Sequence, residues 1–199
     1  MRTLAVALAL FLAGSFCALA QPAKTTQGNA QGCDLPNADT VVLGIKLGDS
    51  ASAVKILGED YKTIADKPLS DLAWTIFASR DNKQLLLLRH HPGDVENSFL
   101  EVEVKFGRHD RKPKNLKVYD FITGKGIKLG MKKKAVIAKF GPCFKSTETD
   151  DDTEIVRYEI KDEKASSGIL KATNMPQYYA EYEFRNGILI RFKFGHAPV

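Results

Sequence analysis

The hydrophobic residues between positions 132 and 140 follow the period of an α-helix. Ala135, Val136 and Phe140 are spaced so that they share one helix face, which predicts an amphipathic helix over this segment. Gly141-Pro142 follows directly. This pair is expected to end the helix, because glycine accepts the left-handed cap and proline cannot continue a helix.

Strand patterns occupy much of the rest of the chain. Apolar residues alternate with others over 72–78, run continuously over 85–88 and alternate strictly with charged residues over 100–106. Strict alternation is typical of a strand with one face in water. The segment 156–160 repeats the alternation, and a closing hairpin is predicted over 177–194.

The register of this hairpin depends on its turn, at Arg185-Asn186-Gly187. A two-residue Asn-Gly loop would set Glu183 opposite Ile190, which mixes polar and apolar residues on one face. A three-residue loop with Gly187 left-handed sets Glu181 opposite Arg191 and keeps the polar residues together. We therefore predict the three-residue turn with a glycine bulge.

One short sequence occurs twice. The pentapeptide Gly-Ile-Lys-Leu-Gly at 44–48 returns unchanged at 126–130. In both copies an Ala-Val pair follows five residues after the last glycine, and both copies close on Lys-Phe-Gly. Two copies of one unit are therefore predicted, roughly over 44–107 and 126–195.

The first copy should also hold a helix, which Asp49 or Ser50 can cap and Gly58 can end. Each unit is then a short helical segment followed by three or more antiparallel strands. The expected fold class is α+β, with two tandem repeats, each a short helical segment packed on an antiparallel sheet of three to four strands.

The pattern Gly-Ile-Lys-Leu-Gly-Met, with a valine five residues after the methionine and Gly-Pro five further on, followed by antiparallel strands, resembles a unit shared by two families. One is the small lipoprotein of the outer-membrane β-barrel assembly machinery. The other is the secreted β-lactamase inhibitor protein, which carries the unit in tandem. The resemblance covers nearly all of the chain after its first forty residues. It implies a fold rather than an activity, because it rests on glycines and apolar spacing.

The N-terminus has the pattern of an export signal. Arg2 precedes an apolar run from Leu4 to Leu12, and Ala18-Leu19-Ala20 provides a small-residue cleavage site. We divide the chain accordingly into a signal peptide (1–20), a flexible N-terminal segment (21–40), a first repeat (41–107), a basic linker (108–125) and a second repeat (126–199). The expected location is the periplasm or the extracellular medium, with no transmembrane segment in the mature chain.

Two cysteines remain after cleavage of the signal, Cys33 and Cys143. An even number in an oxidising compartment favours one disulfide between them. The alternative is two separate buried thiols.

The chain lacks the common catalytic and metal-binding motifs. Adjacent His90 and His91 would point to opposite faces of a strand, so they are poorly placed to ligate one metal. We therefore expect a non-enzymatic protein without a metal or other cofactor.

Positive charge is concentrated between Lys105 and Lys145, where thirteen Lys or Arg stand against two Asp. Three consecutive lysines fall at the start of the second helix, where they oppose the positive end of its dipole. A candidate partner-binding patch therefore comprises Arg108, Arg111, Lys112, Lys114, Lys117, Lys132, Lys133 and Lys134. The alternative is a solvated basic face that aids solubility.

Together these features predict an exported binding protein of the cell envelope. Its partner would be another envelope protein or an anionic lipid or lipopolysaccharide surface, and export argues against nucleic acid. One alternative is a proteinaceous inhibitor of a secreted hydrolase, which the resemblance implies. A third possibility is a small-ligand carrier that uses the space between the repeats.

Overall fold

The fold was determined as a computed structural model. It describes residues 25–27, 38–66, 74–91, 94–109, 113–149, 152–161, 168–173 and 175–196. The predicted signal peptide, Cys33, Arg111 and Lys112 lie outside these residues.

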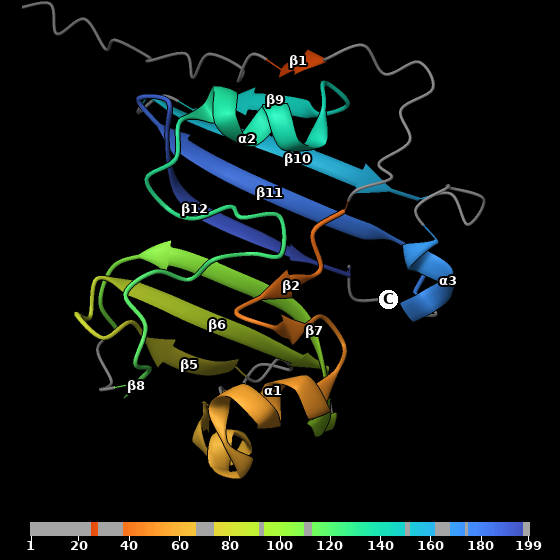
Figure 1. The fold of residues 1–199 in the computed structure, drawn as a ribbon. Coiled ribbons are helices and arrows are strands. Elements are labelled where there is room, and N and C mark those ends of the chain that lie inside the picture. The colour runs from red at the N-terminus through yellow and green to blue at the C-terminus, as the bar shows by residue number, and fades with distance from the viewer. Residues whose placement is uncertain are drawn as a thin grey trace, which may run out of the picture.

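The described residues form a ten-stranded sheet, a small two-stranded sheet and few short helices (Figure 1). Along the chain the elements are β1 (Thr25–Gln27), β2 (Val41–Val42), β3 (Ile45–Lys46), α1 (Ser50–Leu57), the 3₁₀ helix η1 (Glu59–Ile64), β4 (Ala65–Asp66), β5 (Trp74–Ala78), β6 (Gln84–His91), β7 (Asp94–Phe106), β8 (Lys114–Asn115), α2 (Lys133–Phe140), β9 (Lys145–Glu148), β10 (Thr153–Ile160), α3 (Ile169–Thr173), β11 (Tyr178–Arg185) and β12 (Ile188–Gly195).

The large sheet has the strand order β1-β9-β10-β11-β12-β7-β6-β5-β4, and β8 also pairs with β5. All the pairs are antiparallel except β5 with β8, so the sheet is mixed. Strand β1 comes from the segment 21–40 that we expected to be flexible, and it pairs with β9. No helix in the described part of the chain has the length and apolar character needed to cross a membrane.

The predicted fold class, two α+β helix-on-sheet repeats, is wrong. The strands of both copies belong to one sheet, because β7, which closes the first copy, pairs with β12, which closes the second. The physical reason is the unpaired edge that each closing strand would otherwise expose, since free backbone N–H and C=O groups of an edge invite pairing. Mutual pairing of the two strands satisfies both edges and makes the protein mostly β.

The repeated pentapeptide does form the same local structure twice. Ile45 and Ile127 are both fully buried, and the glycines at both ends of each pentapeptide have positive φ. The segment before the second copy lies against the first, since Leu43 N–H donates to the Ile122 carbonyl at 2.9 Å. The repeat in the sequence therefore records a repeated backbone geometry, in which the first copy contributes β3 to the two-stranded sheet and the second copy, also described, forms no named strand.

Both predicted helices are confirmed. Helix α1 begins after Asp49, whose carboxylate accepts a hydrogen bond from Ser52 N–H at 3.1 Å, and it ends at Gly58. Helix α2 ends at Gly141 as expected. Its N-cap residue is Lys132, which makes no side-chain capping bond.

The core lies between one face of the sheet and a covering layer of α1, α2 and the β2–β3 hairpin, which Figure 1 shows on the same side. Helix α2 is held by aromatic contacts: the Phe140 ring lies 5.4 Å from that of Tyr158 and 5.2 Å from that of Tyr182. The linker contributes as well, because Phe121 is fully buried.

The predicted hairpin register is also wrong, although the constraint behind it holds. The turn is the two-residue loop Asn186-Gly187, with φ of 51° and 73°, so Arg185 pairs with Ile188. A register shift between Glu183 and Phe184 then sets Glu183 opposite Arg191. The strand therefore restores the separation of faces with a bulge, not with a longer turn.

A substitution at Gly195 can test how closely β7 and β12 pair. A Cβ added there would lie 2.2 Å from the Leu100 carbonyl oxygen, a backbone atom that cannot rotate away. We predict that Gly195→Ala lowers the free energy of unfolding by about 3 kcal/mol, as overpacking against a rigid neighbour does. Thermal unfolding monitored by circular dichroism measures this.

Gly48→Ala is the matched control, because its Cβ would meet nothing within 4 Å and only its φ of +75° opposes the substitution. That control should lose about 1 kcal/mol. A Gly195→Ala loss no larger than that of the control would contradict the tight pairing.

Candidate functional site

The sheet face turned away from the helices carries most of the ordered charge. We call it the ladder face, and it comprises Arg89, Glu101, Glu103, Lys105, Lys145, Arg157, Glu159, Glu181, Glu183, Arg191 and Lys193. These residues share one side because their pairings run in register from β9 to β6. The opposite side of the same strands is the core.

The sign of the charge alternates over part of the ladder face, although Arg191 stands directly opposite Lys105 and Arg157 directly opposite Lys145. Strand β12 presents cations between the glutamates of β7 and β11, and Lys193 stands directly opposite both Glu103 and Glu181. Opposite charges across neighbouring strands stabilise a sheet by roughly 0.2–1 kcal/mol a pair. This alternation therefore helps to set both the pairing and the register of the strands.

Arg191 lies at the centre of this pattern. Its Nη2 lies 3.1 Å from Glu103 Oε2 on β7, and its Nη1 lies 3.1 Å from Glu183 Oε2 on β11. Lys105 reaches the other oxygen of Glu103 at 3.0 Å. One guanidinium thus joins the two halves of the chain across β12.

A second chain of ion pairs covers β9 to β12. Arg157 pairs with Glu159 at 2.7 Å and also with Glu181, while Lys193 Nζ lies 2.9 Å from Glu181. The Tyr179 ring lies beneath both cations, with 4.7 Å from Arg157 Cζ and 5.4 Å from Lys193 Nζ to its centroid. Ion pair and ring together fix the position of each cation.

The charges lie at different depths. The Glu103 side chain is 7% exposed and the Glu159 side chain 17%. Lys145 is 55% exposed, and Lys161, which follows β10 and also pairs with Glu159, is 59% exposed. Other cations lie as deep as the carboxylates, since Arg89 is 14% and Lys193 20% exposed. The outermost charges on this side of β9 and β10 are therefore the two lysines.

The carboxyl groups respond differently to this environment. Burial opposes ionisation of Glu103, but the hydrogen bond and charge of Arg191 outweigh it and hold the Glu103 pKa below its usual value. For Glu159, burial is likewise outweighed by Arg157 and Lys145, and the pKa falls to about 2. Burial dominates at Glu101, whose pKa is raised despite Arg89.

At the β5–β6 end the ladder face becomes apolar. Ala78, Leu85 and Leu87 are buried there, with Trp74 and Ile76 packed against them. Arg89 lies over the Trp74 ring, 5.8 Å from its centroid. An apolar area thus borders the charged one on a single continuous surface.

The six described residues of the predicted basic patch fall into two groups, and Arg111 and Lys112 lie outside the described residues. Arg108 is exposed in the loop after β7, Lys114 on β8 pairs with Asp60 at 3.0 Å, and Lys117 is exposed. Strand β8 is attached to β5, near one end of the sheet.

The remaining lysines lie elsewhere. Lys132, Lys133 and Lys134 are together at the start of α2, where Lys133 N–H donates to the Gly187 carbonyl at the β11–β12 turn. The Lys133 side chain pairs with Glu154. These lysines therefore lie apart from Arg108, Lys114 and Lys117, although they are close in the sequence. Lys133 and Lys114 are also partly neutralised by their acidic partners.

The other candidate residues are placed as follows. Cys143 is half-buried shortly after α2, and since Cys33 lies outside the described residues, the disulfide stays a prediction. His90 is buried, and its Nε2 lies 3.2 Å from Thr75 Oγ1. The described ranges hold no group of three or more His, Cys, Asp or Glu that could bind a metal.

The sequence did contain the signal for the ladder face. Two glutamates alternate with valines on β7, and an arginine and a lysine alternate with phenylalanines on β12. Charges of opposite sign that recur at every second residue on two strands indicate how the strands pair, provided that the strands are known to be neighbours. The strands β7 and β12 are far apart in the sequence, and the sequence alone did not show that they pair.

Comparison of the chain with protein-family models, with curated proteins and with solved structures finds no match. The resemblance to the assembly lipoprotein and the β-lactamase inhibitor protein therefore stays a prediction.

Two neighbouring glutamates of β7 provide a test of the ladder face. At pH 7 we expect Glu103→Gln to destabilise the protein by about 2 kcal/mol, because it removes the more deeply buried of the two carboxylates that Arg191 binds and leaves only Glu183. Glu101→Gln should instead be neutral or stabilising by up to about 1 kcal/mol, because it removes a desolvated charge. Denaturant unfolding of both variants measures the difference.

Their pH dependence follows from the direction of each shift. The contribution of ionised Glu103 to the free energy of unfolding is complete above the ordinary pKa of 4.5. It is lost as the pH falls through the lowered pKa of the folded state. The Glu101 penalty acts above its raised pKa and disappears as the pH falls towards 4.5. Equal effects of the two substitutions at pH 7 would show that the face does not distinguish the two carboxylates.

Proposed function

We propose that this chain is an exported, non-enzymatic binding protein whose ladder face holds an acidic segment of another protein of the cell envelope. The observation that carries the proposal is the pair of exposed lysines, Lys145 and Lys161, above the buried carboxylate of Glu159, next to the ordered cations of β10 and β12. Export to the periplasm or the medium rests on the predicted signal peptide.

The order of the cations supports this role. Arg157, Arg191 and Lys193 each contact carboxylates on two sides or a carboxylate and a ring. A side chain that is already fixed loses little conformational entropy on binding, which leaves more of the contact energy for affinity. Arginine and aromatic residues are also the types that dominate protein interfaces.

A protein fits these features better than a membrane surface does. Attraction to a bilayer depends on unneutralised charge within a Debye length, whereas most cations of the ladder face already have a carboxylate partner. What the face offers instead is a fixed spacing of cations in rows across the strands, about 4.8 Å apart. Fixed spacing favours a partner with carboxylates at matching intervals.

The experiment reverses charge on one face at a time. Lys145→Glu with Lys161→Glu changes the outer ladder face, where both lysines are more than half exposed, so the fold should persist. Lys134→Glu with Lys139→Glu makes the same charge change on exposed positions of α2. Each full-length variant is used to retain proteins from envelope extract, and the Kd of the main retained protein is then measured.

We expect the double substitution at Lys145 and Lys161 to raise the Kd at least about ten-fold. The double substitution on α2 should change the Kd by no more than about two-fold. Loss in the α2 variant alone, together with loss after replacing Lys132, Lys133 and Lys134 by Ser, Ala and Ser, would favour the basic segment instead. Equal loss in both would indicate nonspecific attraction. One-to-one inhibition of a secreted hydrolase would favour the inhibitor alternative.

A further inference from the structure

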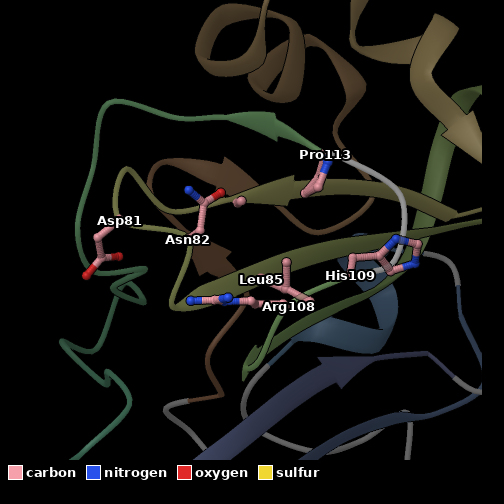
Figure 2. A pocket seen from close by; sticks show the side chains of 7 residues that line it. Asp81, Asn82, Leu85, Arg108, His109 and Pro113 are labelled. Carbon is pink, nitrogen blue, oxygen red and sulfur yellow. The ribbon is translucent and has the colours of Figure 1, made fainter.

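A pocket lies at the apolar end of the ladder face. It encloses about 420 Å³, within the usual size range of small-ligand sites. Seven residues line it: Ala78, Asp81, Asn82, Leu85, Arg108, His109 and Pro113. Figure 2 shows Leu85 near the centre of this group, with Arg108 extended below it and His109 to its right in the view.

The floor of the pocket is apolar. Ala78 and Leu85 stand opposite each other on β5 and β6, and both are almost fully buried. They belong to the same small cluster as Leu87 on the ladder face. The floor can therefore accept an apolar group of the size of a leucine side chain.

The polar groups at the rim leave one positive charge unused. Asp81 accepts a hydrogen bond from Ser79 Oγ at 2.8 Å and pairs with the exposed Lys83 at 3.3 Å, so its charge is partly offset. Arg108 is exposed and makes no ion pair with any residue in the described ranges. The Asn82 amide oxygen accepts from Asn115 Nδ2 at 2.9 Å, which leaves the Asn82 amide nitrogen as a donor.

An apolar floor beside a guanidinium and an amide donor matches an apolar group that bears a carboxylate. We propose that the pocket takes the C-terminal residue of the partner, with an apolar side chain against Ala78 and Leu85 and its terminal carboxylate on Arg108. This inference rests on the proposed function and names the part of the partner that is recognised. A guanidinium holds a carboxylate through paired, charge-assisted hydrogen bonds.

The register of the sheet then specifies the rest of the partner's tail. Ala78, Leu85, Lys105 and Arg191 lie in one row across β5, β6, β7 and β12. At about 4.8 Å a strand, Lys105 is roughly 10 Å and Arg191 roughly 14 Å from Ala78. An extended chain advances about 3.3 Å a residue, and its successive side chains point to opposite sides. One acidic side chain facing this row is therefore expected, either three or four positions before the C-terminus.

The probe is the peptide acetyl-Glu-Glu-Ser-Gly-Leu with a free carboxylate, titrated into the full-length protein and followed by NMR shifts of the Ala78 and Leu85 amides. The same peptide with a C-terminal amide tests whether the terminal carboxylate is needed. A peptide with Gln in place of both Glu residues tests whether their negative charge is needed. Octanoate tests whether a free apolar acid suffices. Arg108→Gln is compared with Lys117→Gln, an equal charge loss at an exposed residue outside the pocket.

We expect the free-acid peptide to bind, and both the amide and Arg108→Gln to weaken binding about ten-fold, while Lys117→Gln leaves it unchanged. Equal binding of the amide, or no effect of Arg108→Gln, would overturn the proposal. If octanoate binds as tightly as the peptide, the pocket is a site for free apolar acids, and the proposal that it recognises the C-terminal tail of a partner is wrong.

The failure of this inference can be told apart from that of the proposed function. If Gln for Glu weakens binding but the amide does not, the ladder face still binds acidic residues and only the pocket assignment is lost. If the peptide binds but Gln for Glu does not weaken its binding, and the charge reversals at Lys145 and Lys161 do not weaken binding of the retained envelope protein, the ladder face is not the binding surface.

Discussion

The pairing of β7 with β12 is the interaction on which the rest of this structure depends. It joins residues about ninety positions apart, through five registered pairs from Arg191–Lys105 to Gly195–Glu101. Without it the sheet would fall into two pieces, each too small to bury much of its surface and each with a long unpaired edge. The close approach at Gly195, where no side chain fits, indicates how tightly the two strands meet. Both the common core and the continuous charged face exist only because this contact forms.

The same contact creates an electrostatic problem, because it buries carboxylates. Glu101 and Glu103 are both nearly inaccessible, and an isolated carboxylate at such depth is strongly disfavoured. Arg191 resolves the problem for Glu103, since it donates from one side and also reaches β11. No comparable donor serves Glu101, whose Oε2 lacks a hydrogen bond although Arg89 lies 3.3 Å away. The two residues show that partner geometry, more than depth, decides whether a buried charge stabilises the sheet.

The sequence predicted what is local and missed what is long-range. The helix ends at Gly58 and Gly141 and the two pentapeptide loops follow from the chemistry of a few adjacent residues, and the structure confirms the helices. The turn at Asn186-Gly187 is equally local, but the bulge that corrects its register responds to burial on the whole face, and a three-residue turn was predicted in its place. The fold class depended on one contact between distant strands, and repeats in a sequence do not say whether their sheets merge. The described basic residues between Arg108 and Lys134 are close along the chain but lie in two places on the sheet, at β8 and at the start of α2.

Because the ladder face spans β9 to β6, the proposed binding surface is built from both copies of the repeat and from neither alone. Glu103 comes from the first copy, and Arg191, Lys193 and Glu181 come from the second. The outer cations keep their spacing only while β7 and β12 stay paired. Anything that loosens this pairing therefore disorders the cations that would meet a partner. A partner bound across the same row would in turn stabilise the pairing by linkage, because it binds the folded sheet and not the separated halves.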